Sequence, residues 1–314
     1  MSLFFEILII VLPVFVVISL GYGLKRTGLI NADFLFQTNR IVYYIALPLL
    51  IFHSISTADF FANFNGRLIV GSALAIVVGF ALSYGWGALR RYPAELRGTF
   101  SQGAFRGNLA YVGLAIIMNA YGEDGFTRAG ILMGFLVPIL NFFAIVALVL
   151  PHRDGGEGTG WSFWLKQIFL NPLIVASFAG IAWSFFAVPM PVILDGSLDI
   201  ATGMALPLAL LAIGGSFSLE KLKGDLVKAA MATGFKLIWL PLICAAILAA
   251  MGVRGIDLGI GVLFAATPAA TANYIMAHQM KGDSTLAGSI IMMSTLASAL
   301  TYTAALLLLR MAGA

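Results

Sequence analysis

Two apolar stretches of this chain contain polar and helix-breaking residues near their middle. The first stretch is 99–121 and the second is 256–279. The residues concerned are Arg106, Gly107, Asn108, Tyr111, Thr267, Pro268, Thr271 and Asn273. Glycine and proline weaken a helix, while amide and hydroxyl side chains hydrogen-bond a ligand or an opened backbone. We expect both helices to be broken there and to form a binding site.

A broken helix has a definite chemistry. The second half of such a helix presents free N–H groups with about half a unit of positive charge, and these bind carboxylates or phosphates. Arg106 would add a counter-charge for an anion, although a snorkelling arginine is the alternative. A kinked but continuous helix is the alternative to a break, because glycine and proline are common in membrane spans.

The composition indicates that a bilayer surrounds these helices. Hydrophobic residues make up 61% of the 314 and charged residues only 10%, with a mean hydropathy of +0.98. Soluble domains are about half apolar and a quarter charged. The net charge of +4 lies in short loops, so it predicts membrane topology and not nucleic-acid binding. The single cysteine, Cys244, forms no intrachain disulfide.

The hydropathy pattern predicts an all-α integral membrane protein with ten spans, each close to the roughly 20 residues that cross the hydrocarbon core. The expected spans are 5–24, 36–56, 67–89, 99–121, 126–150, 165–187, 200–217, 226–251, 256–279 and 285–310. Lysine and arginine gather in the loops on one side, which predicts that this side is cytoplasmic. Both termini are then expected outside an inner membrane.

The two halves of the chain resemble each other. Ala46-Leu47-Pro48-Leu49 returns as Ala205-Leu206-Pro207-Leu208, at an offset of 159 residues. Asp124 and Asp283 share this offset. Each half would hold an odd number of spans, so the second copy is inserted upside down, as in many secondary transporters. The two interrupted stretches fall at corresponding positions of this five-plus-five inverted repeat.

Three further residues are candidates for ion coupling. Lys236 lies inside the span 226–251, where it would contact the substrate or a carboxylate; snorkelling or a contact with a backbone carbonyl is the alternative. His53 and His278 end the second and ninth spans, where either would carry a coupling proton or serve as a hydrogen-bonded interfacial histidine. No pattern predicts a metal site or a cofactor, and H⁺ or Na⁺ is the candidate coupling ion.

The sequence resembles the auxin efflux carrier family, which includes plant auxin exporters and bacterial carboxylate permeases. The resemblance rests on the ten-span outline, the two Ala-Leu-Pro-Leu segments, the stretch from Arg106 to Gly113, and Thr267-Pro268. It implies the architecture of bile-acid sodium symporters, in which the fourth and ninth spans cross at their breaks. The plant carriers have proline at both crossings, whereas here the fourth span has only Gly107.

The resemblance also implies a division into a scaffold and a mobile core with elevator-like transport. The scaffold would comprise 1–60 and 165–220 and is often dimeric, so a homodimer is expected through it. The core would comprise 61–150 and 221–314, with 151–164 as a cytoplasmic loop. The site residues carried over from the family are Asn108, and Pro268 with its neighbours.

These observations together predict a secondary transporter for a small organic anion, of the carboxylate, auxin-like or dicarboxylate kind. A sodium-coupled symporter of the bile-acid type is the alternative. An enzyme is disfavoured, because three histidines, one cysteine and no clustered acids give no convergent catalytic set. A sensor or assembly protein is a third class, which would show no flux.

Overall fold

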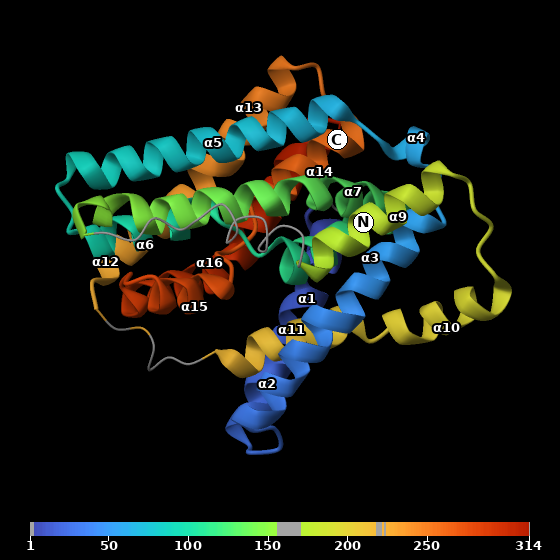
Figure 1. Ribbon diagram of the computed structural model, residues 1–314, viewed down its shortest axis with the longest axis horizontal. Coiled ribbons are helices and arrows are strands. Elements are labelled where there is room, and N and C mark those ends of the chain that lie inside the picture. The colour runs from blue at the N-terminus through green and yellow to red at the C-terminus, as the bar shows by residue number, and fades with distance from the viewer. Residues whose placement is uncertain (1–2, 156–170, 218–221, 223, 314) are drawn as a thin grey trace. The chain divides into compact units, whose positions relative to one another are not determined.

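The computed structural model describes residues 3–155, 171–217, 222 and 224–313 (Figure 1). Every regular element in this part of the chain is a helix, and only one isolated β-bridge is present. The chain divides into two compact units. Unit 1 comprises Met1–Gly66, Ala110–Val137 and Leu165–Phe217, and unit 2 comprises Arg67–Leu109, Pro138–Trp164 and Ser218–Ala314.

Seven helical stretches of the described chain are long and apolar enough to cross a membrane. They are Leu3–Arg26, Ala32–Ser56, Gly66–Leu89, Leu109–His152, Val192–Ser216, Leu226–Ala250 and Ser284–Met311. Two shorter apolar helices are Pro172–Phe185 and Gly255–Ala265. The protein is therefore an all-helical, multi-pass membrane protein. The count of ten spans and the inverted repeat stay predictions, and residues 165–170 of the expected sixth span lie outside the described chain.

Unit 1 is built on two pairs of packed helices. Its helices are α1 (Leu3–Arg26), α2 (Ala32–Ile41), η1 (Val42–Ala46), α3 (Leu47–Ser56), α4 (Phe60–Asn63), α9 (Pro172–Phe185), α10 (Val192–Thr202) and α11 (Ala205–Ser216). α1 packs along α11 and α3 packs along α9 (Figure 1). The first pair is very close, because a Cβ on Gly214 would overlap the Ile18 carbonyl oxygen.

Unit 2 is organised around its longest complete helix, α16 (Ser284–Met311). The other helices are α5 (Gly66–Leu89), α6 (Ala94–Phe105), η3 (Leu150–Gly155), α12 (Leu226–Gly234), η5 (Phe235–Trp239), α13 (Leu240–Ala250), α14 (Gly255–Ala265) and α15 (Ala272–Gln279). α16 contacts α6, α12, α14 and α15. It buries Ser289, Ser294 and Ser298, so small polar side chains line its contacts.

The chain passes from unit 2 to unit 1 and back along η2 (Leu109–Gly113) and α7 (Leu114–Val149). At 1.5 Å per residue, the stretch Leu109–His152 would be about 66 Å long, roughly twice the hydrocarbon thickness. Gly122 interrupts it with φ 64° and ψ −156°, a conformation almost restricted to glycine. The break separates two segments that correspond to the expected spans 99–121 and 126–150.

Two wide π-helical turns precede prolines. η1 is followed by Pro48, and η5 is followed by Pro241. A proline has no N–H group, and its ring clashes with the carbonyl four residues earlier, so a widened turn before it relieves the clash. In η5 the widened turn contains Lys236.

The expected seventh span, 200–217, starts earlier in the structure. Its helical stretch is Val192–Ser216, beginning directly after Pro191, with two turn-like residues between α10 and α11. Asp195 and Asp199 lower the hydropathy of the first turns, which is why the sequence pattern places the start too late. Both carboxylates lie beside His53 and are thus accommodated in the helix.

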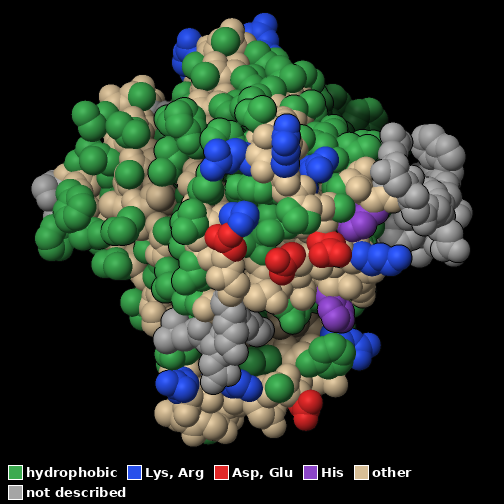
Figure 2. Space-filling view, turned by 90° about the vertical axis from the view of Figure 1, so that its left-hand side faces the viewer, with side chains coloured by type: hydrophobic (Ala, Val, Ile, Leu, Met, Phe, Trp, Pro, Cys, Tyr) green, Lys and Arg blue, Asp and Glu red, His purple; other side chains and the backbone are tan. Residues whose placement is uncertain are grey.

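The surface fits a bilayer. Large hydrophobic side chains are exposed along α1, including Phe4, Phe5, Ile9 and Val16. On the face drawn in Figure 2, hydrophobic side chains cover much of the surface and charged side chains gather in limited regions. Apolar side chains exposed in such numbers would be unstable in water but are at home in lipid.

Candidate functional site

Both stretches that contain the helix-breaking residues are interrupted. α6 ends at Phe105, and residues 106–108 are not helical before η2 begins at Leu109. α14 ends at Ala265, and residues 266–271 are not helical before α15 begins at Ala272. Both breaks lie within unit 2.

The two breaks pair with each other through their backbones. Gly107 and Ala269 form an antiparallel bridge. The Asn108 N–H donates to the Pro268 carbonyl oxygen at 2.8 Å, and the Ala270 N–H donates to the Arg106 carbonyl oxygen at 3.1 Å. This pairing satisfies backbone groups that unwinding removes from the helices, as a membrane interior requires. We call this pair of segments, 106–108 and 266–271, the crossing.

Gly107 permits the close approach at the crossing. A Cβ at this position would overlap Thr267 Oγ1 and would lie 3.0 Å from Lys236 Nζ. Thr267 Oγ1 in turn donates to the Phe264 carbonyl oxygen at 2.8 Å, in the last turn of α14. Any larger residue at 107 would therefore separate the two breaks.

The longer break takes an additional partner from α16. The Ala269 N–H donates to Ser294 Oγ at 3.0 Å, and Ser294 is fully buried. Ser294 was missed by sequence reasoning, because it is one of several small polar residues in its span. Nothing in its spacing shows that its hydroxyl meets the break.

Arg106 is held by amides from two other helices. Its Nη1 donates to Asn273 Oδ1 and its Nη2 donates to Asn141 Oδ1, both at 2.8 Å. Asn273 returns a hydrogen bond from Nδ2 to the Arg106 carbonyl oxygen at 3.3 Å. These contacts fix the guanidinium beside the crossing, whereas snorkelling to the headgroups would turn it away. Asn141 was also missed, although a lone asparagine in the apolar run 126–150 was a signal.

A helix begins at each break. Thr271 precedes α15 and makes no capping hydrogen bond with its side chain. The Asn273 N–H donates to the Ala270 carbonyl oxygen at 3.0 Å, so the first turn of α15 is tight. The N-terminal end of a helix carries partial positive charge, and here no capping side chain neutralises it. Such an end, beside a guanidinium, is suited to a carboxylate.

Lys236 lies at the start of the longer break, next to the end of α14. Its side chain is 1% exposed, and Nζ donates to the Ala265 carbonyl oxygen at 2.5 Å. Ala265 is the last residue of α14. The partner of this lysine is thus a backbone carbonyl, which was one of the expected alternatives.

Asn108 and Tyr111 are separated between the two units. Asn108 is 8% exposed and belongs to unit 2 with the other crossing residues. Tyr111 lies in unit 1, where its hydroxyl donates to Asn39 Oδ1 at 3.4 Å. The sequence spacing places the two residues one turn apart but does not show that the chain changes unit between them.

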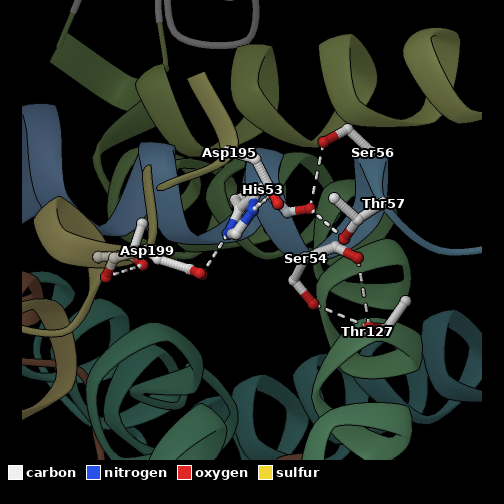
Figure 3. A network of polar contacts seen from close by, with 8 residues as sticks. His53, Ser54, Ser56, Thr57, Thr127, Asp195 and Asp199 are labelled. Carbon is white, nitrogen blue, oxygen red and sulfur yellow. Dashed lines mark hydrogen bonds and ion pairs between the residues drawn. The ribbon is translucent and has the colours of Figure 1, made fainter. Parts of the chain in front are cut away.

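A second polar cluster lies in unit 1 and contains His53 (Figure 3). His53 Nε2 is 2.7 Å from Asp195 Oδ1, and Nδ1 is 3.6 Å from Asp199 Oδ1. Nearby, Ser54 Oγ and Thr127 Oγ1 are hydrogen-bonded at 2.8 Å. These contacts connect α3 to α10 and α7 within the unit. The two aspartates, spaced four residues apart, were not anticipated as partners of His53.

His278 is exposed in the last turn of α15. Within the described residues, no group of three or more histidine, cysteine, aspartate or glutamate side chains is arranged to hold a metal ion. The polar groups that the structure brings together at the crossing are amides, hydroxyls, backbone groups and two basic side chains, which can hydrogen-bond an anion.

Comparison with known proteins agrees with this chemistry. The family model described as "Membrane transport protein" matches residues 6–155 and 160–306. An "Uncharacterized transporter" of Methanothermobacter thermautotrophicus is 27% identical over 92% of this chain and 93% of its own. A "Putative malonate transporter" of Rhizobium meliloti is 27% identical over 97% of this chain and 96% of its own. A "Probable auxin efflux carrier component 3b" of Oryza sativa is 28% identical over 42% of this chain and 23% of its own.

Proposed function

We propose, on the premise that this chain belongs to the membrane transport protein family, that it is a secondary transporter of a small dicarboxylate bound at the crossing. The family match confirms the resemblance to auxin efflux carriers and the assignment as a transporter and not an enzyme. The substrate class, the mechanism and the site residues are our proposal.

One observation carries the proposal: the crossing places a fixed guanidinium beside the N-terminal end of a helix. Arg106 is held by Asn141 and Asn273, and Asn273 itself lies in the first turn of α15. A carboxylate would take charge-assisted hydrogen bonds from such donors. The malonate named for the Rhizobium relative is a small dianion of this kind.

In the proposed site, each crossing residue has a role. Arg106 supplies charge, and Asn108, Thr271 and Asn273 supply hydrogen bonds. Gly107, Thr267 and Pro268 shape the break. Tyr111 would supply a further polar contact through its hydroxyl.

The proposed mechanism is elevator-like alternating access. The core, 61–150 and 221–314, would carry the crossing and its substrate past a scaffold of 1–60 and 165–220. In support of this, both breaks and the two asparagines that hold Arg106 lie in one compact unit. We place the protein in an inner membrane with both termini outside and 151–164 in the cytoplasm, and we propose a homodimer formed through the scaffold. His53 and His278 are candidates for proton coupling.

Substrate binding and flux test the proposal directly. Purified protein would be screened by thermal shift against malonate and other small carboxylates, since a ligand of the native state raises the melting temperature. Uptake of labelled malonate would then be measured in proteoliposomes. We expect Arg106→Gln to lower the apparent affinity about tenfold or more, because it removes a charged hydrogen-bond donor.

Asn119→Ala is the matched control. Asn119 lies in unit 1, outside both breaks, and its side chain donates to the Ile10 carbonyl oxygen. This variant should keep wild-type affinity. If no small carboxylate shifts the melting temperature of the wild type or enters the vesicles, the proposed substrate class is wrong. If Arg106→Gln keeps full affinity, the proposed site is wrong.

A further inference from the structure

Lys236 is an unusual residue for the interior of an apolar span. It is 1% exposed, and among the described residues no carboxylate lies within ion-pair distance of its ammonium. Within the part of the chain that the structure describes, its hydrogen-bond partner is the carbonyl oxygen of Ala265. A lysine inside a membrane protein is costly and is usually retained for function.

The position of the Lys236 ammonium, at the C-terminal end of α14, explains why its charge is stable inside the protein. Ala265 ends α14, and the C-terminal end of a helix carries about half a unit of negative charge from its free carbonyl groups. The positively charged Nζ is directed at this end. The widened turn of η5, which precedes Pro241, contains Lys236 and so helps to direct its side chain inward.

The same place has the features of a cation site. In many secondary transporters, unwound backbone carbonyls and the C-terminal ends of half-helices coordinate the coupling Na⁺. Here the carbonyl of Ala265 and the hydroxyl of Thr267 lie at the start of the longer break. The Cβ position that Gly107 lacks is in contact with both Thr267 Oγ1 and Lys236 Nζ. The lysine ammonium therefore lies beside the oxygen atoms that a small cation would use.

We propose that the ammonium of Lys236 is a built-in cation at the C-terminal end of α14, taking the place of a free coupling sodium ion. Because this cation is covalently attached, it stays at the broken helix throughout the cycle, whereas a free ion could leave. Transport would therefore need no sodium, and the sodium-coupled alternative would be excluded by a side chain of the protein itself. This inference rests on the proposed transport function but has a readout that does not depend on the substrate.

The test compares the wild type with Lys236→Met, which has a similar length but no charge. Melting temperatures would be measured in NaCl, KCl and N-methyl-D-glucamine chloride at equal ionic strength. The wild type should melt at the same temperature in all three. Lys236→Met should be destabilised but recover by about 3 °C in NaCl, as expected when a vacated site binds an ion at roughly ten times its dissociation constant.

Malonate uptake in the same media gives the second readout. The wild type should transport equally in all three salts, whereas Lys236→Met should lose about tenfold of its rate in sodium-free medium. Lys228→Gln is the matched control, because it removes a positive charge from the same span, where Lys228 pairs with Asp225. It should keep its rate and show no sodium effect on its melting temperature.

Two results would overturn the inference. One is a wild type whose melting temperature is higher in NaCl than in the other two salts, or whose malonate uptake stops without sodium. The other is a Lys236→Met protein whose melting temperature is the same in every salt. That result would mean that Lys236 contributes packing and does not replace a cation. If Lys236→Met does not fold, Lys236→Gln replaces it. Absence of any carboxylate flux in the wild type would contradict the proposed function but leave the melting comparison valid.

Discussion

The two breaks of unit 2 occupy corresponding positions in the proposed repeat, yet they are built differently. The break at 106–108 is short, has no proline and carries an arginine. The break at 266–271 is longer, contains Pro268 and takes partners from Ser294 and Lys236. In the proposed site, the short break thus supplies the charge, while the long break is held in place by side chains of other helices.

In the proposed repeat, this difference would give a near-symmetric fold an asymmetric site. The backbone pairing between Gly107 and Ala269 is shared by both breaks and opens both helices. The charges are not shared, because Arg106 lies on one break and Lys236 supports the end of the helix before the other. We infer that the repeat supplies the geometry and that single substitutions supply the chemistry.

The largest expected effect comes from breaking the contact between the two breaks. Gly107→Ala would place a methyl group on Thr267 Oγ1, so the segments must separate. We expect destabilisation of about 1–3 kcal/mol, in line with overpacked cores, and loss of transport. Thermal unfolding and malonate uptake measure the two effects.

Two further variants make this prediction sharper. Gly234→Ala is the matched control, because a Cβ there meets no atom within 4 Å, and its stability should be unchanged or slightly higher. The double variant Gly107→Ala with Thr267→Ala removes the clashing hydroxyl and should recover part of the stability. A Gly107→Ala protein with normal stability and flux would show that the close approach is not needed.

An intermediate effect is expected from the long break alone. Ser294→Ala leaves the buried Ala269 N–H without its partner, which costs about 1–3 kcal/mol. Ser298→Ala is the control, because among the described residues Ser298 Oγ bonds within its own helix, to the Thr295 carbonyl oxygen. Denaturation of both variants should separate them by about 1 kcal/mol or more. Equal stabilities would mean that the long break does not depend on α16.

The smallest effect is expected outside the crossing. His53→Gln removes the contacts to Asp195 and Asp199, whose side chains are 46% and 72% exposed. Partly exposed pairs contribute about 0–1 kcal/mol, so the melting temperature should fall by only a few degrees. Malonate affinity should not change. A large loss of affinity in this variant would place His53 in the binding site.

The sequence predicted the membrane class and the positions of the two breaks, because hydropathy, glycine and proline act locally. Arg106, Gly107 and Thr267 were recognised as unusual for apolar spans, and the structure brings them together. The partners Asn141 and Ser294 were not recognised, since they come from other helices and only the packing determines which side chains meet the breaks.

Boundaries were harder to predict where charge occurs inside a span. The seventh span was predicted to start after Asp195 and Asp199, because charged residues lower the hydropathy. In the structure both aspartates lie inside the helical stretch, beside His53. Tyr111 was grouped with Asn108 by spacing alone, yet its hydroxyl contacts Asn39 in unit 1. In both cases the deciding contact joins residues far apart in the sequence, which no local pattern reveals.

The most direct measurement is an electron cryo-microscopy map of the protein in lipid nanodiscs with saturating malonate. We predict density for the dianion at the crossing, within hydrogen-bond distance of the Arg106 guanidinium and the first turn of α15, and interrupted helices at 106–108 and 266–271. Continuous helices through both stretches, or malonate bound elsewhere while the crossing remains closed around its own side chains, would contradict the account.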